Sequence, residues 1–164
     1  MGRADTTIVW FKRDLRTVDH RPLAAAAADG AVIPLYVVEP EYWAQPDQHA
    51  RHWEFVRRSV EELANRLGEL GAPLVVRVGD VVDVLDTLHV EHHVGRVVAH
   101  EETGTDWTYA RDRRVAEWAR SRRVTFEEWP TNAVVRRLSS RDDWTTIWNQ
   151  RMGEPLTEEP ERLR

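Results

Sequence analysis

Five short apolar runs recur along the chain, and amphipathic segments separate them in strict alternation. The runs occupy residues 7–11, 31–38, 74–78, 96–99 and 124–127. Continuous apolar runs are typical of strands covered on both faces, whereas a strand with one solvent-exposed face alternates apolar and polar residues. This order of segments therefore predicts a sheet with both faces buried.

The segments between these runs have the periodicity of helices. We expect helices over residues 22–28, 49–70, 81–88 and 107–121. Asp80 and Asp106 stand where an acidic side chain can cap the third and fourth helices. The second helix carries an apolar stripe at spacings of three and four residues, made by Trp53, Val56, Val60, Leu63, Leu67 and Leu70.

Strands that alternate with helices are joined by right-handed crossovers, which make the strands parallel. The sequence thus predicts an α/β fold: a doubly wound, five-stranded parallel sheet, Rossmann-like, with helices on both faces. Ligands of such folds bind at the carboxyl ends of the strands. We assign residues 1–130 to this domain. Residues 131–164 are expected to be an interdomain segment, because residues 153–164 hold four Glu and two Pro, a linker-like composition.

The composition excludes several classes of protein. The 164 residues contain no Cys, which removes disulfides, thiolate zinc sites and cysteine nucleophiles. No apolar run reaches the ~20 residues of a transmembrane helix, so we expect a soluble cytoplasmic protein without a membrane partner. The net charge of −5 argues against a free-standing nucleic-acid binder. The chain has eight Trp, which is a high number for its length. Tryptophan side chains fill cores, stack on planar ligands and cover interfaces, so the number alone does not indicate which of these roles they have.

The most specific stretch follows the first predicted strand. Residues 9–16 read Val-Trp-Phe-Lys-Arg-Asp-Leu-Arg, so three cations surround one carboxylate at the ligand edge of the sheet. Cations hold a neighbouring Asp ionised and can also meet an anionic ligand. On composition alone, the stretch also fits a solvated charged loop.

This stretch resembles the opening signature of the photolyase/cryptochrome family. In that signature a strand ends in W-F-(R/K)-R-D-L-R and is followed by x-x-D-(N/H)-x-P-L and a helix. The resemblance continues in order along the chain, and a late segment is similar to one in bacterial members. It therefore covers nearly the whole chain. The similar residues are 10–23, 34–40, 52–70, 78–80, 109–112 and 134–144.

Members of this family have an N-terminal α/β domain and a larger helical domain, which binds FAD and flips a damaged pyrimidine dimer toward it. The N-terminal domain often holds an antenna pigment that passes excitation energy to the reduced flavin. The resemblance implies that this chain is such an N-terminal domain and that its partner is the parent's helical FAD domain. Damaged DNA and FAD would then belong to the parent, a carbon–carbon lyase or a light sensor, and this chain would hold no catalytic residue.

The resemblance also indicates where an antenna pigment binds. Folate-binding members carry an Asn-Glu pair shortly before the Arg-Asp that aligns with Arg111 and Asp112. Here Trp107 and Thr108 stand in its place, which favours deazaflavin, flavin or lumazine over folate. A cleft that holds no pigment is the remaining alternative. By position, the family's cleft maps onto the strand ends, with Trp43 as a further aromatic face. The implied pigment-binding residues are Arg13, Asp14, Tyr36, Glu101, Glu102, Trp107 and Tyr109.

Other patterns have plainer explanations. Residues 89–93 are rich in His, but they follow a helix at the far end of the sheet, and we expect a surface turn and no metal site. Neither a dinucleotide-type nor a P-loop-type glycine motif occurs. Trp144 and Trp148 are four residues apart, so on a helix they would share one face. We expect this face to be an interface that the helical domain covers; the alternative is local packing against Trp129 or the sheet.

Two functions follow as hypotheses. The first is the N-terminal antenna-type domain of a deoxyribodipyrimidine photolyase or cryptochrome-like protein. The second is a free-standing nucleotide-binding regulatory α/β module that uses the same scaffold, since a fold alone does not determine function. Pigment binding would support the first hypothesis. Adenine-nucleotide binding without pigment binding would support the second.

Overall fold

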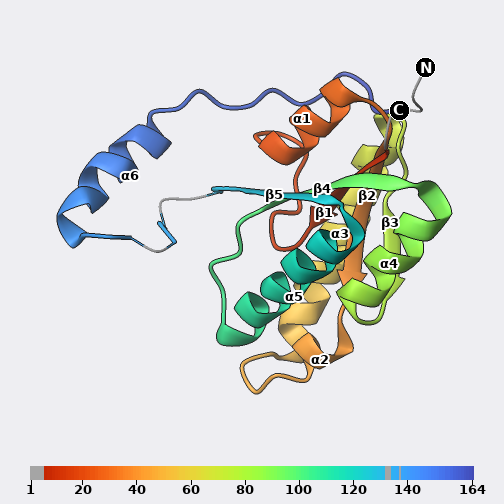
Figure 1. Cartoon of the computed structure of the whole chain (residues 1–164), viewed down its shortest axis with the longest axis horizontal. Coiled ribbons are helices and arrows are strands. Elements are labelled where there is room, and N and C mark those ends of the chain that lie inside the picture. Colours follow the sequence, from red (N-terminus) through yellow and green to blue (C-terminus); the bar gives the residue numbers. More distant parts are fainter. Residues whose placement is uncertain (1–5, 132–133, 137) are drawn as a thin grey trace.

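A five-stranded parallel sheet forms the centre of the molecule (Figure 1). The computed structural model describes residues 6–131, 134–136 and 138–164. The strand order is β3-β2-β1-β4-β5, and each neighbouring pair is parallel. The order reverses between β1 and β4, so the predicted doubly wound fold is confirmed. The strands are β1 (Thr6–Phe11), β2 (Val32–Val38), β3 (Val75–Val78), β4 (Val94–His100) and β5 (Thr125–Trp129).

Helices cover both faces of this sheet because successive residues of the buried strands point to opposite sides. Trp10 of β1 packs in the core beneath α4 and α5, while Phe11 packs in the core beneath α1 and α3. Among the described residues, no helix is both long enough and apolar enough to cross a membrane. The helices are α1 (Arg21–Asp29), α2 (Pro40–Trp43), α3 (Ala50–Glu69), α4 (Val81–His92), α5 (Asp106–Arg122) and α6 (Trp144–Met152), with a short 3-10 turn η1 (Arg141–Asp143).

The helix ends confirm one predicted cap and correct two other predictions. Asp80 caps α4 by accepting a hydrogen bond from the amide of Val82 (2.9 Å). The cap of α5 is Thr105 rather than Asp106. Asp106 is the first helical residue, where its negative charge interacts favourably with the helix dipole. The predicted surface turn over residues 89–93 is wrong, because α4 continues to His92 and ends at His93 in the left-handed conformation (φ 53°).

Trp144 and Trp148 lie on one face of α6, as predicted, with ring centroids 6.3 Å apart. The helix itself was not foreseen, since residues 134–152 show no clean period. Figure 1 shows α6 standing apart from the sheet. The two rings are 44% and 39% exposed, so the described part of this chain does not cover this face, and its role as an interface with another domain stays a prediction.

Residues 153–164, which we call the C-terminal strap, run from α6 past α1 toward the opposite end of the sheet (Figure 1). Thr157 and Asp19 exchange two hydrogen bonds, at 2.9 and 3.1 Å. The amide of Leu163 donates to the carbonyl of Leu70 (2.7 Å), and its side chain is buried in the core. A segment of linker-like composition is thus anchored along its length. Its role as an interdomain segment stays a prediction.

The anchoring of the strap predicts unequal effects of two leucine substitutions. Leu163→Ala removes a buried side chain, so we expect the free energy of unfolding in urea to fall by about 2–4 kcal/mol. Leu156, in the same strap, is 76% exposed, and Leu156→Ala should change stability by less than about 0.5 kcal/mol. Equal effects of the two substitutions would contradict the docking of the strap.

Candidate functional site

A buried arginine organises the carboxyl ends of β2 and β4. Arg111, on α5, is 6% exposed and donates hydrogen bonds to Glu39 (2.9 Å), Glu102 (3.1 Å) and Asp112 (3.0 Å). Its guanidinium lies 4.8 Å from the ring centre of Trp10 and 5.7 Å from that of Trp107. Carboxylates at the edge of the planar group and rings on its faces suit arginine better than lysine.

A lysine joins the end of β1 to the same network. Lys12 donates from Nζ to Asp112 (3.0 Å) and to Glu128 (3.2 Å), and its ammonium lies 4.7 Å from the ring centre of Trp10. Arg136 also pairs with Glu128 (3.0 Å). The cation that follows Phe11 is therefore a buried structural ion, although the sequence equally fitted a solvated loop.

Burial sets the protonation of this network. It raises the pKa of Glu39 from its ordinary value to about 7, although Arg111 opposes the shift. Burial alone would lower the pKa of Arg111, but Asp112, Glu39 and Glu102 together raise it. The arginine thus keeps its charge, whereas Glu39 changes charge near neutral pH.

Asp14 receives hydrogen bonds from three separate segments of the chain. Its Oδ1 accepts from the amide of Lys12 (2.9 Å), while its Oδ2 lies 2.8 Å from His20 Nε2 and 2.6 Å from His100 Nδ1. Asp14 and both imidazoles are buried. Burial alone would raise the pKa of Asp14, but the hydrogen bonds with His100 and His20 hold it well below its usual range. Asp14 is therefore an anion.

The hydrogen bonds also fix which ring nitrogens carry protons. The amide of Leu23 donates to Nδ1 of His20 (3.1 Å), so the Nε2 of His20 carries the proton and donates to Asp14. Because Asp14 is ionised, Nδ1 of His100 donates as well, and in the neutral ring Nε2 of His100 is an acceptor. Burial lowers the pKa of His20 despite its bond to Asp14.

The same three side chains have the spacing of a metal site, since their ligand atoms lie within 4.8 Å of one another. A metal on Nε2 of His20 would require the proton to move to Nδ1, which the amide of Leu23 already occupies. Protons therefore account for the cluster better than a metal ion does.

A large aromatic cavity lies beside this cluster. It has a volume of about 880 Å³ and extends from the end of β1 to the start of α3. Tyr42 and Trp43 of α2 contribute rings whose centroids are 5.2 Å apart, and Tyr36, His52 and Phe55 line it as well. The size lies within the ordinary range for small-molecule sites, and the lining of rings with a few polar groups is typical of them.

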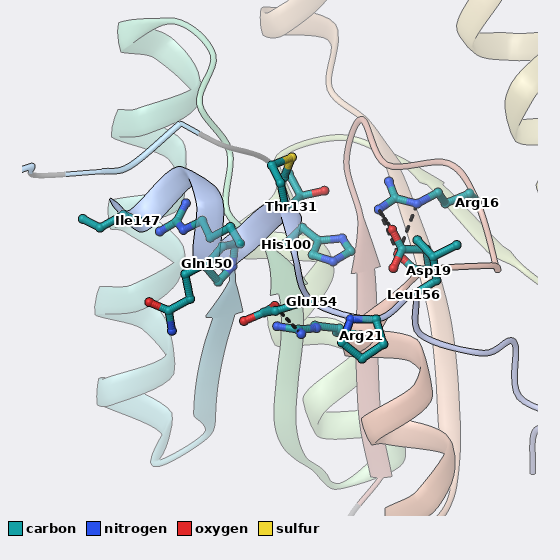
Figure 2. Close-up of a pocket in the computed structure, with 13 residues that line it drawn as sticks. Arg16, Asp19, Arg21, His100, Thr131, Ile147, Gln150, Glu154 and Leu156 are labelled. Carbon is teal, nitrogen blue, oxygen red and sulfur yellow. Dashed lines mark hydrogen bonds and ion pairs between the residues drawn. The ribbon is translucent and has the colours of Figure 1, made fainter. Parts of the chain in front are cut away.

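Two polar cavities adjoin the aromatic one. The first, which we call the tail cavity, measures about 380 Å³ and is lined by the loop after β1 together with His100, Glu101 and Thr131. The second measures about 510 Å³ and lies between α6, the strap and the end of β4. Figure 2 shows the His100 ring among the side chains of the second cavity, above the ion pair of Arg21 with Glu154.

The predicted site residues divide among these features. Arg13 and Asp14 line both the aromatic and the tail cavity, Tyr36 lines the aromatic cavity, and Glu101 and Glu102 line the tail cavity. Whether they contact a pigment stays a prediction.

The two predicted aromatic residues of α5 lie elsewhere. The ring centroid of Trp107 is 5.5 Å from that of Tyr42, behind the wall of the aromatic cavity. Tyr109 is 45% exposed and lines none of the cavities described above.

His100, Glu39 and Tyr42 stand in the loops after the fourth and second apolar runs, at the edge where the sequence predicts ligand binding, but none of them was selected as a pigment-binding residue. The only signal for His100 and Glu39 was their position directly after an apolar run, and Tyr42 lies on a helix that was not expected.

The lowered pKa of His20 predicts a pH-dependent stability. The unfolded state binds this proton more tightly, so the free energy of unfolding should fall as the pH drops below the unfolded pKa of about 6.5. Asn can still cap α1, but it does not ionise. We therefore expect His20→Asn to lose less stability than the wild type between about pH 7 and pH 5 in urea titrations.

Exposed His92 provides the control for that experiment, since His92→Asn should lose stability with pH as the wild type does. If His20→Asn and the wild type lose the same free energy of unfolding over this pH range, the pH dependence does not come from His20.

The comparisons with known proteins agree with this architecture. The family model described as DNA photolyase matches residues 7–143. A cryptochrome DASH of Oryza sativa subsp. japonica is 33% identical over 110 residues, which are 62% of this chain and 19% of that protein. A deoxyribodipyrimidine photo-lyase of Salmonella typhimurium is 39% identical over 72 residues, which are 43% of this chain and 15% of that protein.

Solved structures share the fold over almost the whole chain. A cryptochrome from Synechocystis sp. PCC6803 has a TM-score of 0.82 at 22% identity, covering 99% of this chain and 38% of its own. The archaeal photolyase from Sulfolobus tokodaii, described with two FAD molecules, has a TM-score of 0.74 at 22% identity, covering 97% and 37%. The curated relatives are matched over 14–23% of their length. The family match covers more than half of the residues, and the chain therefore belongs to the DNA photolyase family.

Proposed function

We propose that this chain binds a light-absorbing pigment at the carboxyl edge of its sheet, as the antenna-type domain of a light-dependent DNA repair or blue-light-sensing protein. The aromatic cavity carries this proposal. Its rings come from β2, α2 and α3, and Asp14, held by His20 and His100, lines it as well. A planar heteroaromatic ring can stack on Tyr42 or Trp43 while polar groups meet its edge.

The pigment we propose is a deazaflavin, a flavin or a lumazine rather than a folate. Trp107 occupies one position of the polar pair implied for folate binders, and its ring packs near Arg111 and Tyr42. An indole in that place supports the wall of the cavity and offers no carboxylate to a pterin. The two FAD molecules described for the Sulfolobus tokodaii photolyase support the idea that related proteins can accommodate a second flavin.

The partner we propose is a helical FAD domain of the same parent protein, which would hold the flavin and meet damaged DNA. Residues 131–164 would form the segment toward it. The exposed rings of Trp144 and Trp148 support this, since paired aromatic side chains of this size are common at interfaces. The chain contains no Cys, which fits a reducing compartment such as the cytoplasm.

The proposal predicts that the purified chain binds riboflavin, a deazaflavin or a ribityl-lumazine, measured by quenching of pigment fluorescence. Trp43→Ala removes a ring from the aromatic cavity, and we expect it to weaken binding by about tenfold. Trp148→Ala is the matched control because that ring lies on α6, and its affinity should equal the wild type.

The same titration with ATP tests the alternative function. Binding of ATP without binding of any of these pigments would favour the free-standing nucleotide-binding module instead.

A further inference from the structure

Helix α2 carries two rings of the aromatic cavity and is joined to the rest of the fold through side chains. It has four residues, none of them buried, and its Tyr42 and Trp43 amides donate to the carbonyl of Glu39. The ring centroid of Trp43 lies 5.1 Å from that of Trp53, on α3. The ring centroid of Tyr42 lies 5.5 Å from that of Trp107, on α5. A helix this short is not stable alone, so its order depends on these contacts.

Glu39, at the N-terminus of α2, adds a charged contact. Its carboxylate pairs with Arg111 (2.9 Å), but this guanidinium also binds Glu102 and Asp112. Asp112 has a second cation in Lys12. The buried part of this network thus sets two cations, Lys12 and Arg111, against three carboxylates. When all three carboxylates are ionised, one buried negative charge is uncompensated, which is costly.

This surplus charge falls on Glu39. Asp112 is also bound by Lys12, and Glu102 lies 3.6 Å from Arg13, whereas in the described part of the chain Glu39 pairs with Arg111 alone. The two partners line a cavity of about 30 Å³, which has room for about one water molecule. One water does not replace the hydration shell of a carboxylate. Burial accordingly raises the pKa of Glu39 to about 7.

Further titratable groups face Glu39 from β2, α2, α4 and α5. Asp80, at the start of α4, pairs with Arg114 of α5 (2.6 Å), and its negative charge raises the pKa of Glu39 further. The positive charge of Arg114 offsets part of this effect. The hydroxyl groups of Tyr36 and Tyr42 are neutral, because burial raises the pKa of both. These neighbours therefore leave the ionised form of Glu39 poorly compensated.

We propose that Glu39 is a proton switch for the wall of the aromatic cavity: its neutral carboxyl stays docked on Arg111, and loss of the proton releases α2 from α5. The neutral carboxyl still accepts a hydrogen bond from the guanidinium. In the docked state the buried carboxyl binds its proton more tightly than in a released state, where water surrounds it. A rise in pH therefore favours release. The switch needs no bound pigment, so it stands apart from the proposed function.

Amide hydrogen exchange of the ligand-free chain tests this switch. Release leaves α2 without its supporting contacts, so the amides of Tyr42 and Trp43 become exposed, and their protection, corrected for the intrinsic exchange rate, reports on docking. The pKa of Glu39 is about 7 when docked, against an ordinary value of 4.5. Linkage then predicts protection about tenfold lower at pH 8 than at pH 6. The amides of β1 should be unaffected.

Two glutamine variants identify the titrating group. Glu39→Gln keeps an oxygen that accepts from Arg111 but cannot ionise. Its α2 amides should therefore have the same protection at pH 6 and pH 8, equal to that of the wild type at pH 6. Glu41→Gln makes the same chemical change at an exposed residue of α2. This matched control should keep the tenfold dependence on pH.

The possible failures are distinguishable. Equal protection of the wild-type amides at pH 6 and pH 8 would overturn the switch, and this comparison needs no variant. A pH dependence that Glu39→Gln retains in full would overturn the assignment to Glu39. Low protection of Glu39→Gln at both pH values would show that the neutral group does not hold α2, which also overturns the proposal. Failure of the chain to bind any pigment would overturn the proposed function and leave the switch intact.

Discussion

The ionised carboxylate of Asp14 is the constraint on which the functional edge depends. It joins the end of β1, the start of α1 and the end of β4 through one backbone amide and two imidazoles. A buried charge is costly unless its hydrogen bonds are complete, so none of these three segments can move alone. Because all three cavities have walls in these segments, their shapes depend on the same carboxylate.

The second organising group, Arg111, controls the charge of the neighbouring wall. Three carboxylates share its guanidinium, and burial raises the pKa of one of them, Glu39, to about 7. Charges in such a buried wall act over short distances with little screening. Arg111 and Glu39 share a small cavity with Tyr36, Tyr42 and Trp43, so this pair of charges adjoins the aromatic cavity without lining it.

The sequence predicted the layers of the fold well, because apolar periodicity reports directly on which faces are buried. It predicted the cavity edge only in part. Asp14 was recognised from its local motif, but His100 lies 86 residues away, and the meeting of the two depends on β1 and β4 being neighbours in the sheet. The linker-like composition of residues 153–164 was a poor guide to its contacts, since Glu and Pro report local preference while the burial of Leu163 depends on α3.

The strap also has a consequence for the order in which the protein folds. The contact between Leu163 and Leu70 closes a loop of more than ninety residues, and such closures are entropically slow. On the ribosome, the layer formed by α1 and α3 stays incomplete until residue 163 has emerged. Contacts that form after the folding transition state act mainly on the rate of unfolding, so we expect the strap to slow the unfolding of a sheet that is already assembled.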